Sequence, residues 1–121
     1  MLKVKQLFDE IEADDGQRLW VESHGLTMDL QEWCRVDHVL SHVGPSQRLS
    51  EWFEEHGDAY EYFRGMYHTE LAKSRFLPLL QQLAMAAQQE NFTLLHQGDD
   101  PAHNTGTALY EFIVELQAYS S

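Results

Sequence analysis

The segment from His96 to Asn104 contains the side chains with the most evident chemical potential in this sequence. His103 could act as a general acid or base, and Asp100 could orient its ring, which is the smallest set that such catalysis needs. The segment follows an apolar stretch and precedes a helical pattern, a place where α/β folds often bind ligands.

The same segment permits two other interpretations. Free backbone amides at the start of the following helix would favour an anion, to which His103 or Asn104 could donate. Asp99 and Asp100 oppose an anion, however, and Asp100 before Pro101 is typical of a helix N-cap with proline at the first helical position. We favour the capping role and keep the other two as hypotheses.

Four further residues carry weaker signals. Ser46 lacks the Gly-x-Ser-x-Gly surroundings of a nucleophile, and a helix N-cap explains it. Cys34, the only cysteine, has no cationic neighbour in sequence and is expected to be a small buried apolar residue. His38 and His42 are four residues apart but lack the third ligand and the glutamate of a zinc motif. We therefore expect no metal and no cofactor.

Composition narrows the class of protein. A chain of 121 residues with 43% hydrophobic and 12% aromatic residues predicts one packed domain spanning 1–121. The formal charge of −12 opposes non-specific binding of nucleic acid. The sequence contains no apolar stretch of membrane-spanning length, and its N-terminus lacks the pattern of a signal peptide. These features favour a cytoplasmic protein without nucleic-acid or membrane partners.

The apolar patterns predict strands at both ends of the chain and helices in the middle. Residues 2–7 alternate as a half-buried strand, 17–22 have the continuous apolar run of a central strand, and 92–96 are short and apolar. Helices are expected from Ser46 to Gly57, from an Asp58 cap to Leu71, and over 76–87 with Pro78 in the first turn. A final helix is expected to end by about Ser120. Residues 27–44 fit either a helical turn or a strand. The pattern predicts a small α/β domain with a short, mainly parallel sheet and about four helices.

Several short motifs also run through the chain in a fixed order. They are Asp14-Asp15-Gly16-x-Arg18, Gly25-Leu26, Pro45-Ser46-x-x-Leu49-x-x-Trp52-Phe53, Phe63-Arg64-x-x-Tyr67-x-x-Glu70-Leu71, and Thr93-Leu94-Leu95 followed by Asp100-x-x-His103-Asn104. In these motifs the sequence resembles the YeaO-like group of the domain of unknown function 488 family over nearly its whole length. The resemblance implies helices packed on a mainly parallel sheet and no established activity.

The sequence departs from that group where the group carries positive charge. Members typically have Val-Asp-Arg-x-Trp-Pro-Arg-Gly after the second strand, whereas Val21-Glu22-Ser23-His24-Gly25 stands here in a segment about three residues shorter. Asp99 occupies a position that is often lysine in the group. The group's arginines and lysine would suit a phosphate or carboxylate, so the resemblance implies a divergent member with an impaired anion pocket.

Two functions follow as hypotheses. The first is a non-catalytic binding or interaction domain with a polar cleft, for an unknown small molecule or protein, with a homodimer left open. The second is an enzyme that acts on a small polar or anionic substrate with His103 as general acid or base. A more remote third is an acidic partner for a basic protein. The residues expected to converge on the cleft are Arg18, Ser46, Arg64, Tyr67, Asp100, His103 and Asn104.

Overall fold

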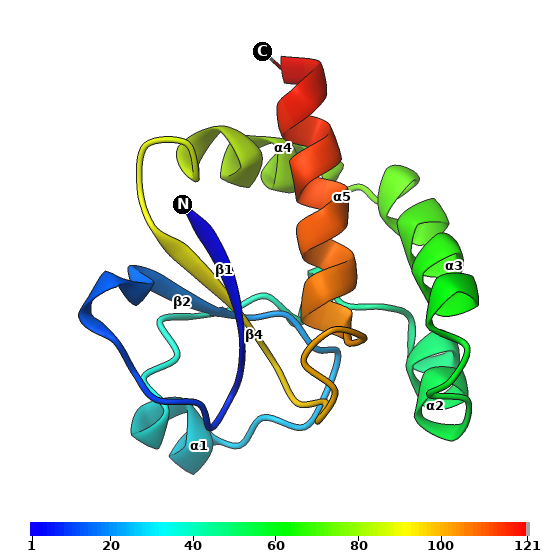
Figure 1. Ribbon diagram of the computed structural model, residues 1–121, viewed down its shortest axis with the longest axis horizontal. Coiled ribbons are helices and arrows are strands. Elements are labelled where there is room, and N and C mark those ends of the chain that lie inside the picture. The colour runs from blue at the N-terminus through cyan, green and yellow to red at the C-terminus, as the bar shows by residue number, and fades with distance from the viewer. Residues whose placement is uncertain (121) are drawn as a thin grey trace.

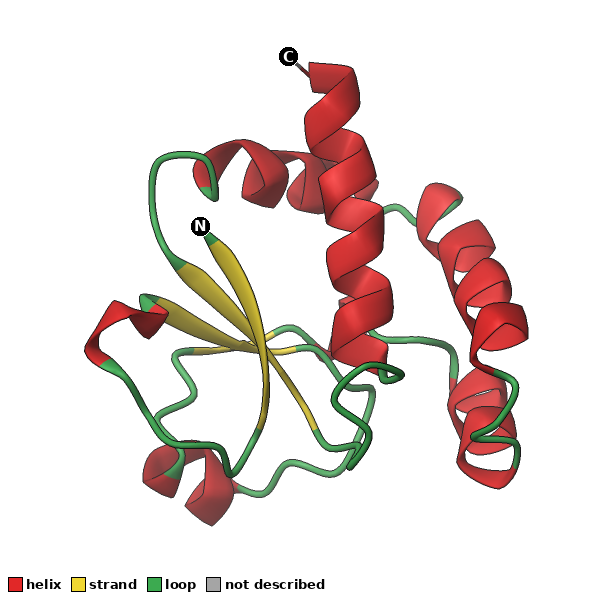
Figure 2. Ribbon diagram, viewed as in Figure 1, coloured by secondary structure: helices red, strands yellow, loops and turns green. Residues whose placement is uncertain are grey.

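The computed structural model describes residues 1–120, and its strands form one parallel sheet (Figures 1 and 2). The strands are β1 (Leu2–Gln6), β2 (Gln17–Trp20), β3 (His38–Val39) and β4 (Phe92–His96), in the order β1-β4-β2-β3. β4 and β2 occupy the centre, which confirms the central place predicted for residues 17–22 from their continuous apolar run, and β4 is buried as its apolar sequence predicts. Because every pairing is parallel, the carboxyl ends of β1, β4 and β2 meet at one edge of the sheet.

Helices cover both faces of this sheet. The helices are α1 (Met28–Trp33), α2 (Gln47–Glu55), α3 (Tyr60–Ala72), α4 (Leu77–Ala86) and α5 (Thr105–Ser120), with short 3-10 turns at Ala13–Asp15 and Ser41–Val43. In Figure 1, α4 and α5 lie beside the sheet, α2 and α3 lie outside α5, and α1 stands apart from them. The predicted α/β class and parallel sheet are confirmed, with α1 as an additional helix.

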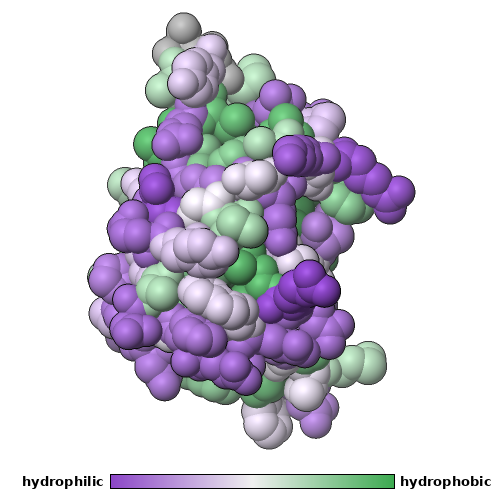
Figure 3. Space-filling model, turned by 90° about the vertical axis from the view of Figure 1, so that its right-hand side faces the viewer, coloured by the Kyte–Doolittle hydropathy of each residue, from purple (hydrophilic) through white to green (hydrophobic). Residues whose placement is uncertain are grey.

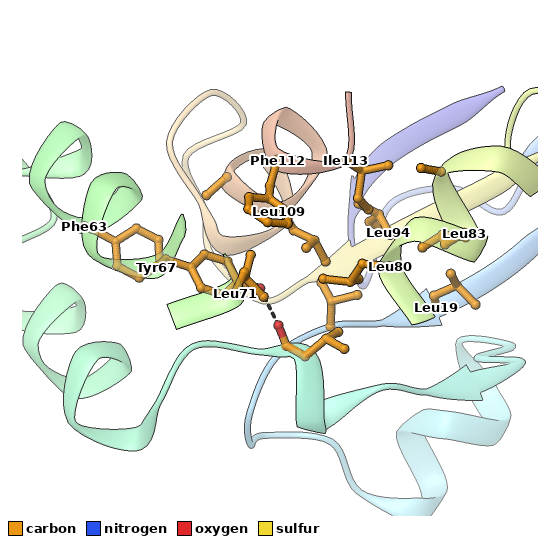
Figure 4. Packing of buried hydrophobic residues seen from close by; sticks show 14 of the residues in the cluster. Leu19, Phe63, Tyr67, Leu71, Leu80, Leu83, Leu94, Leu109, Phe112 and Ile113 are labelled. Carbon is orange, nitrogen blue, oxygen red and sulfur yellow. Dashed lines mark hydrogen bonds between the residues drawn. The ribbon is translucent and has the colours of Figure 1, made fainter. Parts of the chain in front are cut away.

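Alternating side chains of the strands build two apolar clusters. Leu19 and Leu94 pack with residues of α2 to α5, whereas Trp20 and Leu95 belong to a smaller cluster with Cys34, against which Leu30 of α1 packs. Figure 4 shows the larger cluster, in which Phe63 and Tyr67 point from α3 toward the residues of α5. Cys34 is buried in the smaller cluster, which confirms its predicted environment.

The helix boundaries follow from local chemistry, with one exception. The Ser46 hydroxyl accepts the amide of Leu49 and caps α2, and Pro78 lies in the first turn of α4, both as predicted. The prediction that Asp58 caps α3 was wrong. Ala59 is the N-cap residue and makes no side-chain cap, while its backbone amide bonds to the carbonyl of His56 at 2.9 Å.

The ambiguous segment 27–44 contains both structures that its pattern allows. Thr27 caps α1 by accepting the amide of Leu30 at 3.1 Å, and the chain then reaches the edge of the sheet as the two-residue strand β3. Neighbouring Trp33 stays exposed on α1. A search of the described helices finds no segment long and apolar enough to cross a lipid bilayer.

Candidate functional site

A cleft of about 390 Å³ opens where β2 and β4 end and α5 begins. The carboxyl edge of a parallel sheet is the usual ligand position in α/β folds. Three chain segments form its walls: the residues after β2, helix α2 with the turn after it, and the loop between β4 and α5. The lining residues are Glu22, Ser50, Phe53, Glu54, Gly57, Gln97, Gly98, Asp99, Asp100, His103, Asn104 and Thr105.

Glu22 is the buried acid of this cleft, with 4% of its surface exposed. It lies two residues beyond β2, and its carboxylate accepts the backbone amide of Gln97 at 3.0 Å and a hydrogen bond from Thr105. Burial raises the pKa of Glu22, although these two hydrogen bonds act in the opposite direction. The cleft thus holds a carboxyl group that is partly desolvated and fixed in position.

The rest of the cleft adds more negative charge. Glu54, Asp99 and Asp100 line it together with Glu22, and no lysine or arginine is among its lining residues within the described chain. His24 reaches Glu54 from the rim, with 3.3 Å between Nε2 and Oε1. The field inside the cleft therefore favours a positively charged group and opposes an anion.

The loop after β4 is held by its own side chains, in a way that differs from the prediction. The Asp100 carboxylate accepts the amides of Ala102 and His103, but α5 begins only at Thr105. Asn104 is the residue that caps the helix, because its Oδ1 accepts the amide of Thr107 at 2.7 Å. The prediction of Asp100 as the N-cap of this helix was therefore one turn too early, since Pro101 starts a turn and not the helix.

His103 lines the cleft, and two contacts orient its ring. Nδ1 lies 3.5 Å from the Asp100 carboxylate, and the ring stacks on Tyr60 with centroids 4.6 Å apart. The Tyr60 hydroxyl donates to Glu111 at 2.9 Å, which anchors the stack to α5. His103 and Asp100 are therefore adjacent in the cleft, although both are about half exposed.

Arg18 does not line this cleft. Its guanidinium is buried beside Asp15, with 2.5 Å between Nη1 and Oδ2, and donates to the carbonyl oxygens of Cys34 and Arg35. Lys3 and Lys5 bind the other oxygen of Asp15 at 2.9 and 2.7 Å. Arg18 thus belongs to a structural ion-pair network, and the convergence expected for it is not observed.

Three more of the residues predicted for the cleft make their contacts outside it. Ser46 donates to Glu70 at 2.6 Å in addition to capping α2. Arg64 forms ion pairs with Glu111 and Glu115 on α5. Tyr67 is buried and donates to the carbonyl oxygen of Val43 at 2.6 Å (Figure 4). Of the seven residues expected to converge, the cleft brings together Asp100, His103 and Asn104.

The two histidines that suggested a metal site lie in different elements. His38 lies in β3 and contacts Gln17, while His42 lies in the Ser41–Val43 turn and packs on Phe76. Within residues 1–120, the search for three clustered ligands finds Glu12, Asp14 and Asp15, whose carboxylates already pair with Lys3 and Lys5.

Sequence reasoning missed Glu22, Glu54 and Gln97, which the fold brings to the cleft. Glu22 and Gln97 follow the two central strands, and this position at the end of parallel strands is the signal that could have identified them. Glu54 gave no comparable signal, because it is one of several acids on a charged helix.

Figure 3 shows the face of the molecule that carries α2 and α3, where hydrophilic residues surround smaller apolar areas.

Comparisons with known proteins found a family model and several related proteins. A family model described as the inactive DUF488-N3 subclade matches residues 1–120. Uncharacterized proteins from Mycobacterium bovis and from two strains of Mycobacterium tuberculosis are each 32% identical over 88 residues, which are 68% of this chain and 70% of each relative. No solved structure matches the chain significantly.

Proposed function

Because the chain belongs to the inactive DUF488-N3 subclade, we propose that it is a non-catalytic binding domain whose cleft receives a small cationic ligand. The resemblance to the domain of unknown function 488 family is confirmed by the same match. The subclade's description as inactive supports the absence of catalysis, and the shape and charges of the cleft support binding of a cation.

The observation that carries this proposal is the charge of the cleft. Glu22, Glu54, Asp99 and Asp100 line it without a lysine or arginine among its described lining residues. Arg18 and Arg64 are held in ion pairs elsewhere. A charge-assisted hydrogen bond contributes about 1.5–3 kcal/mol, so losing the group's two arginines and carrying Asp99 in place of its lysine changes which charge the cleft favours.

The shape of the cleft suits an ammonium or guanidinium group on a short apolar stem. Glu22 offers a fixed acceptor at the wall, while Phe53, stacked on Phe63 with centroids 4.0 Å apart, offers a rigid apolar surface for the stem. Glu22 is buried, and an ion pair made in such a low-dielectric environment is stronger than one in water.

Calorimetric titration with n-butylammonium chloride, methylguanidinium chloride and sodium phosphate tests the proposal at matched ionic strength. We expect both cations to bind and phosphate not to bind. Glu22→Gln and Glu54→Gln should each weaken cation binding by about tenfold, the loss of roughly 1.4 kcal/mol from one charged contact. Glu55→Gln is the matched control, because Glu55 is exposed on the same helix as Glu54 but does not line the cleft.

Binding of phosphate as tight as that of either cation would contradict the proposal. Equal weakening by Glu55→Gln and Glu54→Gln would also contradict it, because the effect would then come from net charge and not from the cleft. Glu22→Gln is expected to fold, since the amide oxygen of glutamine can still accept the Gln97 backbone amide.

Catalysis with His103 as general acid or base is the second candidate. One observation favours it: His103 lines the cleft with its Nδ1 3.5 Å from Asp100. Binding remains the better-supported function, because the subclade is described as inactive and four carboxylates oppose an anionic substrate. If His103→Gln leaves cation affinity unchanged, the ring is not needed for binding and its role remains open to a chemical test.

A further inference from the structure

We propose that the acidic cleft continues into a second subsite built on His96, and that the ligand is an elongated cation with a donor group at each end, such as a linear diamine. This inference rests on the proposed function and names the ligand class for the same site. A second cavity of about 410 Å³ carries it, because Gly98 and Asp99 line both that cavity and the cleft.

His96 is the residue that makes this second cavity a binding site. It ends β4, lines the cavity and has only 2% of its surface exposed. Nδ1 makes no hydrogen bond of normal geometry within residues 1–120, and the backbone of Gly98 is the polar group that comes near the ring. A buried polar group without a partner is costly, so such a nitrogen at a cavity wall points to a ligand.

The position of the ring is fixed by the start of α5. A Cβ atom at Gly106 would lie 3.1 Å from Cδ2 of His96 and 3.0 Å from Val4, so the helix approaches this ring closely through a residue without a side chain. Burial lowers the pKa of His96, while Asp9 and the Gly98 backbone act in the opposite direction, so the net effect favours the neutral ring. A neutral imidazole can accept a hydrogen bond from an ammonium group.

The other walls of the second cavity also favour a donor. Asp9 and Asp99 line it, and Asp9 uses one carboxylate oxygen to accept the Gln6 amide at 2.9 Å. Lys5 lines it as well, but its ammonium group is bound by Asp15 at 2.7 Å and by Glu12 at 2.6 Å. The positive charge of Lys5 is thus already neutralised by two carboxylates.

Together, the cleft and the second cavity fit a ligand with a donor group at each end. The first end would meet Glu22 and its neighbours, the apolar stem would cross Gly98, and the second end would meet His96 and Asp9. Gly98 adds no side chain to the shared wall and lies close to the His96 ring, since a Cβ atom there would make ordinary contacts with Asn104 at 3.5 Å and with Nδ1 of His96 at 3.8 Å. A monoamine could satisfy only one of the two subsites.

Calorimetric titration of the full chain with n-butylammonium chloride and with 1,4-diaminobutane or spermidine tests this inference. A second linked contact should make one of the polyamines at least about tenfold tighter than the monoamine. His96→Phe and Asp9→Asn should remove that gain and leave monoamine affinity unchanged. Asp29→Asn, an exposed change on α1, is the control for net charge.

The imidazole nitrogens provide a readout that does not depend on the variants. In protein labelled with ¹⁵N-histidine, the His96 signals should shift with the polyamine and not with the monoamine. If both polyamines bind no more tightly than n-butylammonium, the second subsite is refuted while the proposed function stands. If none of the amines binds, both are refuted.

Discussion

The hydroxyl of Tyr67 donates to the carbonyl oxygen of Val43 in the interior of the molecule, at 2.6 Å. Burial raises the pKa of Tyr67 well above its usual value, and the nearby carboxylates of Glu22 and Glu70 act in the same direction. We expect Tyr67→Phe to reduce the free energy of unfolding by about 1–2 kcal/mol, because a buried carbonyl loses its donor. Urea denaturation measures this loss.

Cation affinity is the control for the same variant. Tyr67 does not line the cleft, so Tyr67→Phe should bind n-butylammonium as wild type does. A large loss of affinity in a variant that remains folded would assign Tyr67 to the ligand site after all.

Asp15 gives a prediction about acid stability. Burial alone would raise its pKa, but hydrogen bonds from Lys5, Lys3, the Glu12 amide and Arg18 outweigh burial and hold the pKa well below its usual range. The folded state therefore binds this proton more weakly than the unfolded state. The stabilisation is fully present above the unfolded pKa of about 3.9 and is lost as the pH falls further toward the folded pKa.

Unfolding free energies measured between neutral pH and acid should show this decline. Asp15→Asn should be less stable at pH 7, because Lys3, Lys5 and Arg18 lose their shared partner, and its stability should fall less steeply below pH about 4. An identical slope for Asp15→Asn and wild type would show that other carboxylates account for acid unfolding.

Residue types predicted the local structural role of a side chain better than they predicted which side chains meet in the cleft. Ser46 as a helix cap and Cys34 as a buried apolar residue followed from short-range chemistry. Arg18 and Arg64 looked like ligand-binding side chains, but Asp15, three residues before Arg18, and Glu111, far from Arg64 in sequence, bind them. The pairing of Arg64 with Glu111 depends on the packing of α3 against α5, which no local pattern records.

At the scale of elements, the turn before β2 depends on a glycine. Gly16 has φ 64°, and a Cβ atom there would lie 1.9 Å from the carbonyl oxygen of Asn91. We expect Gly16→Ala to destabilise the fold by roughly 2 kcal/mol or more, since both the backbone conformation and the contact with Asn91 oppose a side chain. Thermal or urea unfolding measures the change.

Gly57→Ala is the matched control for this turn. No atom lies within 4 Å of a Cβ built at Gly57, and its φ is outside the left-handed region. The control should be neutral or slightly stabilising. Equal stability of the two variants would contradict the role given to Gly16.

The strands and most helices were predictable because their apolar periods are strong. The central place of β2 followed from its continuous apolar run, and β4 was recognisable as a short apolar strand. The segment 27–44 was ambiguous because a six-residue helix and a two-residue strand are too short to show a period. The start of α5 was misplaced because Asp100-Pro101 and Asn104 both carry cap chemistry.

At the scale of the whole molecule, the charged residues that give the formal net charge of −12 are unevenly distributed. Lys3, Lys5 and Arg18 gather around Asp15, and Arg64 pairs with Glu111. The carboxyl edge of the sheet keeps carboxylates without matching cations among its described lining residues. An acidic cleft therefore arises from where the chain places its few positive charges, as well as from its composition.

Chemical-shift mapping tests the central claim, that this cleft binds a cation, most directly. Amide spectra of ¹⁵N-labelled wild-type protein would be recorded during titration with n-butylammonium chloride and, separately, with sodium phosphate at matched ionic strength. The account predicts that butylammonium shifts the amides of Gln97, Gly98 and Thr105, which line the cleft, and that phosphate leaves them in place. Shifts of these amides by phosphate, or butylammonium shifts spread evenly over the surface, would contradict it.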